Sequence, residues 1–250
     1  LNEYIRNITV SIEIEELNQQ IVDASSDTHV VDLESVTSIP KADFSAFNRD
    51  LYIDGELINE QEYLDAFETG STYLDTLMYA VTVKRADLKC WPIIDFVGYS
   101  AEDPDDEVQL HAINVNEPFV ISQKCIVNNH TFYYGLSRTC DGWIDEDYLA
   151  IFDSKEEWTD AWKVNTNSND FIVVTTDKIS LEPSTNEAVS ELNLYMGTTL
   201  KLVPQNNIPE TVDGRSTYYN YVVYLPTRDE NGKYVQQMAL IPIKNKVNVG

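Results

Sequence analysis

The stretch VKRADLKCWP, residues 83–92, concentrates three scarce cations at Lys84, Arg85 and Lys89, in a chain with 17 Lys and Arg against 42 Asp and Glu. The opposite charge follows in AEDPDDEVQ, residues 101–109. Cations and acids at the two ends of one loop attract each other, although exposed ion pairs are individually weak. We therefore expect a long loop over about residues 88–108 that these charges hold closed.

The totals of the chain argue against several classes of protein. The formal net charge of −25 over 250 residues argues against nucleic acid and against an anionic membrane surface, because both need clustered Lys and Arg. An apolar fraction of 43% argues against wholesale disorder. No apolar run approaches the roughly 20 residues of a membrane span. Three Cys and three His, all scattered, match no zinc pattern, so we expect no metal and no cofactor.

Residues 1–80 have the pattern of a mixed, helix-rich N-terminal domain. Residues 11–24, SIEIEELNQQIVDA, carry apolar side chains near helical spacing. Residues 51–58, LYIDGELI, predict a tight hairpin, because Asp54-Gly55 supplies the positive φ angles of the turn. Residues 59–70, NEQEYLDAFETG, begin with a capping-box-like pair and end on a glycine, which predicts a short helix.

From about residue 81 the pattern changes to β. Short runs rich in Val, Ile and aromatic residues are broken by Asn, Asp and Gly, which is typical of small barrels. Residues 154–162, SKEEWTDAW, predict a helix that separates this series of strands from a second one. The second series includes Asn231-Gly232, which predicts a tight hairpin. The two series share a loose layout, so we interpret them as two related barrels, over residues 81–152 and 153–250.

Three motifs in the first series point to a known family. They are KRADLKCWP at 84–92, DDEVQLHAINVNEP at 105–118 and CDGWIDEDYLA at 140–150. The first resembles Arg-Thr-Asp-Leu-Arg-x-x-Pro, the second Asp-x-x-Gln followed by Gly-Glu-Pro, and the third a Gly-Trp closing strand. These are marks of the first bacterial SH3-like (SH3b) domain of certain NlpC/p60-type cell-wall cysteine peptidases.

The second series resembles the second SH3b domain of that group through EEWTDAW, FIVVTTDKI and LYMGTTLKL. Three positions depart from the family pattern. Lys89 replaces an Arg, Ile93 a Thr, and Asn116 the Gly before Glu-Pro. These departures concern the details of ligand binding rather than the fold.

The resemblance implies an architecture and a setting for the chain. Residues 1–80 resemble the family's N-terminal stabilising domain only in helical character and position, and a catalytic domain is expected after residue 250. The implied fold is mainly β, with two tandem SH3-like (SH3b) small barrels preceded by a mixed, helix-rich N-terminal domain. The chain would have no catalytic residue and no cofactor of its own. It would be secreted or held at a bacterial cell envelope, where it would position peptidoglycan stem peptides for a downstream cysteine endopeptidase.

The long loop supplies the candidate binding residues. Carboxylates suit an ammonium group, and aromatic rings add cation–π and stacking surface. The resemblance implies that this SH3b domain helps to recognise the free amine end of a stem peptide. The residues expected to contact the ligand are Trp91, Asp95, Tyr99, Asp105, Asp106 and Tyr134. Those expected to hold the loop and the sheet are Arg85, Asp87, Lys89, Gln109 and Trp143.

The loop residues also have a purely structural interpretation. Lys84, Arg85 and Lys89 would pair with nearby acids, Asp87 would cap a turn, and Asp106 would accept loop-closing hydrogen bonds. The acidic run at 102–107 lacks the glycine and the alternating spacing of an EF-hand loop, which favours a solvated turn over a calcium site.

Two other functions stay open at the level of sequence. A stand-alone SH3-like surface protein that binds a protein or cell-wall partner is the main alternative. A chain that is itself an enzyme rests only on scattered Cys, His and acids. Cys125 lies in the middle of an expected strand, where no helix N-terminus lowers its pKa, so a buried and inert thiol is favoured.

Overall fold

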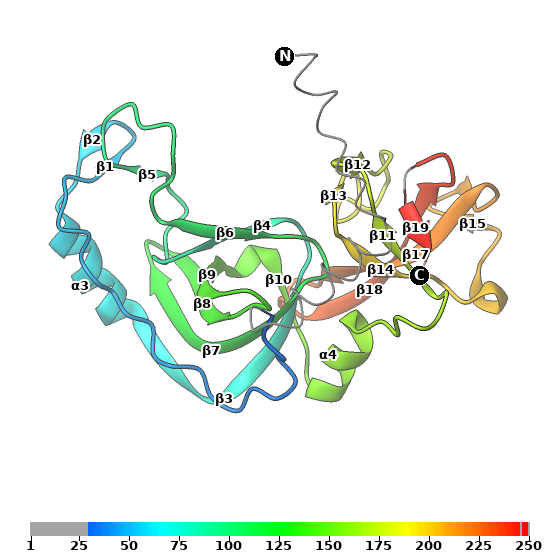
Figure 1. Cartoon of the computed structure of the whole chain (residues 1–250), viewed down its shortest axis with the longest axis horizontal. Coiled ribbons are helices and arrows are strands. Elements are labelled where there is room, and N and C mark those ends of the chain that lie inside the picture. The colour runs from blue at the N-terminus through cyan, green and yellow to red at the C-terminus, as the bar shows by residue number, and fades with distance from the viewer. Residues whose placement is uncertain (1–29, 246, 250) are drawn as a thin grey trace, which may run out of the picture. The chain divides into compact units, whose positions relative to one another are not determined.

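The computed structural model describes residues 30–245 and 247–249, and these are mainly β (Figure 1). Leu33–Gly250 forms one compact unit. The helix predicted over residues 11–24 lies outside the described residues. Between residues 30 and 80 the chain has an extended segment, a hairpin, one helix and most of a long strand, so the prediction of a helix-rich domain is wrong for this described part.

The hairpin and the helix of the N-terminal part form over the predicted residues. The expected capping box does not form, because the Asn59 side chain donates to the Glu62 side chain at 2.8 Å and caps no backbone group of the helix. Strands β1 (Tyr52–Ile53) and β2 (Glu56–Leu57) pair across Asp54 and Gly55, whose φ angles are 51° and 80°. Helix α3 (Glu60–Gly70) follows, and its Gly70 allows the close approach of the Ile126 carbonyl. The hairpin also pairs with β5 (Val97–Gly98), a short strand inside the long loop.

The first series of strands forms a seven-stranded antiparallel sheet. Its order is β10-β3-β7-β8-β9-β4-β6. The strands are β3 (Ser71–Thr82), β4 (Ala86–Lys89), β6 (Gln109–Ile113), β7 (Pro118–Val127), β8 (His130–Leu136), β9 (Asp141–Asp145) and β10 (Leu149–Ile151). A 3₁₀ turn, η1 (Glu146–Tyr148), joins β9 to β10. Residues 90–108, between β4 and β6, are the long loop, called the opening loop below.

The register of this sheet places alternate side chains on its two faces. Tyr133 and Ile144 lie directly opposite each other and pack with Leu88 and Phe119 in one hydrophobic core. Their neighbours along the strands point to the opposite face, called the outer face below. One row of outer-face residues runs across the sheet through directly paired positions. Its members are Tyr73, Gln123, Tyr134, Trp143, Lys89 and Gln109.

The second series forms smaller sheets around a core of its own. Its strands are β11 (Phe171–Val174), β12 (Lys178–Ser180), β13 (Asn193–Tyr195), β14 (Thr199–Lys201), β15 (Thr211–Val212), β16 (Arg215–Ser216), β17 (Asn220–Arg228), β18 (Tyr234–Pro242) and β19 (Val247–Val249), with a 3₁₀ turn, η2 (Gln205–Asn207). The predicted hairpin around Asn231-Gly232 is confirmed, since β17 and β18 pair over their full lengths. The pairing gives an open order in the first series and several short sheets in the second, so it establishes a mainly β fold rather than closed barrels.

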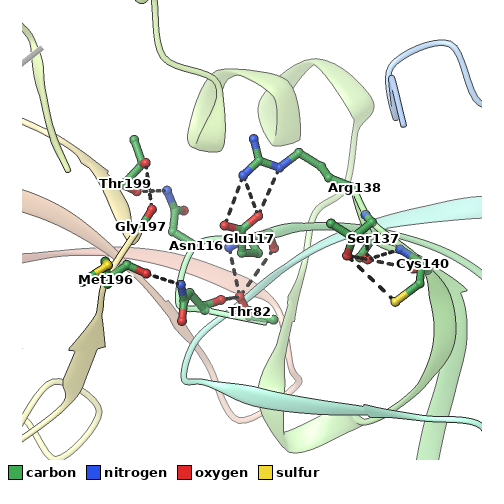
Figure 2. A network of polar contacts seen from close by, with 11 residues as sticks. Thr82, Asn116, Glu117, Ser137, Arg138, Cys140, Met196, Gly197 and Thr199 are labelled. Atoms are coloured by element: carbon green, nitrogen blue, oxygen red, sulfur yellow. Dashed lines mark hydrogen bonds and ion pairs between the residues drawn. The ribbon is translucent and has the colours of Figure 1, made fainter. Parts of the chain in front are cut away.

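Helix α4 (Lys155–Trp162) and a polar network join the two series. Ser154 caps the helix as predicted, by accepting a hydrogen bond from the Glu157 backbone N–H at 3.2 Å. The Trp158 indole is fully buried and donates to the Ala80 carbonyl at 2.8 Å. The network of Figure 2 includes Asn116, whose side-chain amide donates to the Thr199 carbonyl at 3.1 Å. Asn116 has a φ of 64°, a conformation that Gly and Asn tolerate best, which accounts for Asn at this position.

We predict that Gly135→Ala destabilises the protein. A Cβ at Gly135 would lie 2.1 Å from the Val120 carbonyl oxygen, and that oxygen belongs to the backbone of the neighbouring strand β7. Overpacking of this kind typically costs about 1–3 kcal/mol. Urea unfolding followed by circular dichroism measures the loss. Gly214→Asn is the control, because nothing lies near its Cβ position and Asn tolerates its φ of 72°. Equal stability of the two variants would contradict the prediction.

Candidate functional site

A buried ion pair closes the opening loop. The Lys89 ammonium lies 2.9 Å from the Asp106 carboxylate, and their side chains are 9% and 10% exposed. The ammonium also donates to the carbonyls of Ile94 and Asp95, at 3.2 and 2.8 Å. Asp106 accepts hydrogen bonds from the backbone N–H groups of Val97 and Val108, at 3.2 and 3.4 Å. The prediction that opposite charges hold the loop closed is confirmed for this pair.

The other two cations of the opening motif do not behave as predicted. The Lys84 ammonium lies 4.0 Å from the centre of the Tyr148 ring, and the Arg85 guanidinium lies 4.5 Å from that of Tyr195. Both make cation–π contacts in place of the expected contacts with acids. Asp87 lies within β4 rather than at a turn, and its carboxylate accepts a hydrogen bond from the Gln109 side chain at 2.9 Å.

The inner side of the opening loop packs against the N-terminal part. The Trp91 indole is 1% exposed and contacts the rings of Phe47 and Phe67, with centroids 5.2 and 5.6 Å away. Trp91 therefore belongs to a hydrophobic core, and it has no free face for a ligand. The Tyr99 ring contacts Phe47 at 6.2 Å and carries the Arg49 guanidinium at 4.8 Å.

Two adjoining pockets of about 220 and 70 Å³ lie between the outer face, α3 and the opening loop. They share Ile93, Ile94 and Phe132. We call them together the acidic groove. Its polar and aromatic lining includes Asp87, Asp95, Asp145, Tyr63, Tyr148 and His130, together with one cation, Lys89, which pairs with Asp106.

The carboxylates of the acidic groove act on its aromatic rings. Burial raises the pKa of Tyr148 above its usual value, and the charges of Asp145 and Asp87 raise it further. Burial also raises the pKa of Tyr63, with a smaller contribution from Asp95. Carboxylates beside the faces of rings attract cations, and Tyr148 already carries one, the Lys84 ammonium. The groove is therefore suited to an ammonium or another organic cation.

The structure brings only some of the predicted residues to this groove. Among the predicted ligand contacts Asp95 lines it, and among the loop-holding residues Asp87, Lys89 and Trp143 do. The remaining predicted contacts lie elsewhere. The interior of the loop contains Trp91 and Tyr99, which pack in its hydrophobic core, and Asp106, which pairs with Lys89. Asp105 lies at the exposed acidic turn, and the Tyr134 hydroxyl donates to Asp141.

Sequence reasoning missed Asp145, Tyr148, Tyr63 and Phe132. A signal existed for Asp145, because it follows Trp143 by two positions in a predicted strand and so shares its face. Nothing in the sequence indicated that Tyr63 on α3 would reach the same groove. In the acidic turn, the Asp103 carboxylate accepts hydrogen bonds from the backbone N–H groups of Tyr99 and Asp105.

Burial raises the pKa of two of the three thiols, Cys90 and Cys125. All three cysteines are free, and Cys125 is fully buried with its sulfur 3.6 Å from the Phe67 carbonyl. Burial raises the pKa of Cys125, and it raises the pKa of Cys90 to about 11. Across residues 30–245 and 247–249, no cluster of three His, Cys, Asp or Glu could hold a metal ion, and no helix is long and apolar enough to cross a membrane.

Comparison with known proteins gives a structural similarity only. Neither the scan against protein-family models nor the search of curated proteins finds a match. Among solved structures, the chain is similar to an NlpC/P60 endopeptidase from Photobacterium damselae subsp. piscicida, with a TM-score of 0.54 and 12% sequence identity. The similarity covers 94% of this chain and 44% of that protein, so the chain spans less than half of that enzyme's length. At this identity the similarity concerns the fold alone.

We predict that Lys89→Met destabilises the protein by about 3–5 kcal/mol, because Asp106 is left charged, buried and unpaired. The double variant Lys89→Met/Asp106→Asn should recover part of this loss, since Asn is neutral and still accepts the backbone N–H groups. Chemical denaturation measures both losses. Lys178→Met, at an exposed position, is the control for removal of a cation. A single and a double variant with the same loss would show that the buried charge is not the cause.

We further predict that Cys90 reacts slowly with iodoacetamide at pH 8. The thiolate is the reactive form, and a pKa raised from 9.0 to about 11 reduces its population about 100-fold. The reaction rate of the native protein should therefore rise steeply between pH 9 and pH 11. Peptide mass spectrometry after short pulses measures it, with the denatured chain as reference. A native rate at pH 8 equal to the denatured rate would contradict the raised pKa.

Proposed function

We propose that this chain is the non-catalytic targeting and substrate-positioning module of a bacterial cell-wall hydrolase of the NlpC/p60 type. In this proposal residues 81–152 and 153–250 are two tandem SH3-like domains and residues 1–80 are the N-terminal domain. The sequence motifs at 84–92, 105–118 and 140–150 support it. The structural similarity to an NlpC/P60 endopeptidase over 94% of the chain supports it independently.

The arrangement of the first series supports the SH3-like assignment. A long loop joins its first two strands, β4 and β6, and three further strands follow in antiparallel succession before η1 and β10. Such a loop between the first two strands is a feature of SH3-like barrels. Strand β3 enters this sheet from the N-terminal part and lies inside it, between β10 and β7.

The observation that carries the proposed binding function is the acidic groove. Asp87 and Asp145 both face Tyr148 in one pocket, and Asp95 and Tyr63 line the adjoining one. Carboxylates neutralise an ammonium, and the rings cover the alkyl part beside it. The free amine end of a peptidoglycan stem peptide has this chemistry. A net charge of −25 adds a long-range attraction for such a cation.

Hydrolysis itself is assigned to a part of the parent protein that this chain does not supply. The proposed setting is the bacterial cell envelope or the surrounding medium, where peptidoglycan fragments occur. The module would hold the amine end of a stem peptide and so restrict which fragments reach a cysteine active site.

We predict that the chain binds a murein peptide with a free N-terminal alanine and rejects the same peptide when it is N-acetylated. Asp145→Asn should weaken binding about 10-fold or more, because one charge-assisted hydrogen bond is worth about 1.5–3 kcal/mol. Asp75→Asn, at an exposed position outside the groove, is the matched control. Isothermal titration calorimetry measures all four affinities. Equal binding of the free and acetylated peptides would reject the proposal and favour a stand-alone surface protein with a different partner.

A further inference from the structure

Residues 37–47, called the strap below, cross the outer face of the first sheet in extended conformation. None of them belongs to a helix or strand. In Figure 1 this dark blue segment runs beside β3 and β7 and then along α3. The strap includes Pro40, Ala42 and Phe44, and it lies entirely within the compact unit Leu33–Gly250.

The strap contacts successive strands of the first sheet at the row of outer-face residues that includes Tyr73, Gln123 and Trp143. The Tyr73 hydroxyl on β3 donates to the Ile39 carbonyl at 2.7 Å. The Ala42 N–H donates to the Gln123 side chain on β7 at 2.5 Å. The Phe44 ring stacks on Trp143 of β9, with centroids 5.7 Å apart and planes inclined by 13°. Ile39 to Phe44 therefore run across the strands along one continuous line.

Tyr134 of β8 completes this line. It lies directly opposite Gln123 on one side and Trp143 on the other. Burial raises its pKa, its hydrogen bond to Asp141 raises it further, and the charge of Asp43 in the strap adds a smaller contribution. The four residues Tyr73, Gln123, Tyr134 and Trp143 are called the aromatic row below.

The strap leaves polar groups of the aromatic row unsatisfied. The Gln123 Nε2 and Trp143 Nε1 donors have no hydrogen-bond partner in the described part of the chain. Their residues are 0% and 1% exposed, so neither donor lies at the molecular surface. Ala42 offers an N–H, which fixes the Gln123 oxygen toward the strap and leaves its amide nitrogen without an acceptor. Buried donors without partners are rare and call for an explanation.

The backbone of the strap bonds to side chains of the sheet and of α3, and it forms no backbone ladder with them. Within residues 37–47, no backbone N–H or carbonyl bonds to the backbone of another described segment. Ile39 and Ala42 are 2% and 7% exposed, so apolar burial rather than a backbone hydrogen-bond ladder holds the strap, and its opening breaks no pairing of the sheet beneath. Pro40 restricts the strap to extended conformations, and an extended proline-containing peptide on an aromatic-lined face is a recurrent recognition mode.

We infer that the aromatic row is a binding groove for an extended peptide and that the chain's own residues 39–44 occupy it. The external ligand is a peptide that carries a proline and, four positions later, an aromatic side chain to stack on Trp143. Its carbonyl oxygens would accept the hydrogen bonds of Gln123 Nε2 and Trp143 Nε1, which the strap leaves unused. This groove shares Trp143 with the acidic groove but takes a different ligand, so the inference does not require the proposed function.

The test uses the full chain and a synthetic probe, residues 38–46 as the acetylated amide SIPKADFSA. Phe44→Ala removes the ring that covers Trp143 and should bind the probe at least 10-fold more tightly than the native chain. The Trp143 indole N–H resonance in the NMR spectrum should shift on binding. Phe47→Ala is the matched control, because that ring contacts Trp91 and Tyr99 instead, and its affinity should equal that of the native chain.

Three results would overturn the inference. The first is that Phe44→Ala gains no affinity for the probe. The second is that the probe leaves the Trp143 resonance unchanged. The third is that light scattering shows the native chain to be a dimer, as expected if copies exchange their straps. If Phe44→Ala fails to fold, Pro40→Ser replaces it, because it loosens the strap without removing a ring. In the native chain, amide hydrogens of residues 41–44 should exchange at least 100-fold faster than those of β7 and β8. Equal rates would show a fixed structural segment and reject the inference.

Discussion

The buried ion pair of Lys89 and Asp106 is the contact on which the arrangement of the first sheet and its loop depends. It joins the end of β4 to the last turn before β6. The Lys89 ammonium has three oxygen partners at 2.8–3.2 Å, which compensates for removing it from water. Asp106 fixes the backbone of Val97 and Val108 on the same side. With the loop closed, β5 can pair with β1, and Trp91 can enter its core.

This constraint explains why a strongly acidic chain concentrates cations in one motif. Each of the three has a separate task, since Lys89 closes the loop while Lys84 and Arg85 lie on the rings of Tyr148 and Tyr195. Tyr195 belongs to the second series of strands, so Arg85 also links the two series. Around the groove, Asp87 accepts a hydrogen bond from the Gln109 side chain. Asp145 accepts one from the Asp147 backbone N–H and lies 3.7 Å from the His130 ring nitrogen. No Lys or Arg pairs with these two carboxylates in the described part of the chain, and this makes the groove attractive to cations.

Local chemistry made part of the fold predictable. Asp54-Gly55 and Ser154 act through their nearest neighbours, so the hairpin and the cap of α4 could be predicted from the residues themselves. The acidic groove depends on long-range packing. Periodicity assigns Trp143 and Asp145 to one face of a strand, but it does not say that α3 covers that face. For the same reason Trp91 was expected at the surface, although Phe47 and Phe67 enclose it.

We infer that the Lys89–Asp106 ion pair makes the opening loop part of the cooperative core of the first sheet. Native-state hydrogen exchange of the unmodified chain tests it most directly, through the amides of Cys90, Val97 and Val108. If the ion pair holds the loop, these amides exchange with the same opening free energy as those of β7 and β8 and change together with them in denaturant. Exchange through a separate opening, several kcal/mol lower in free energy and insensitive to denaturant, would contradict the claim.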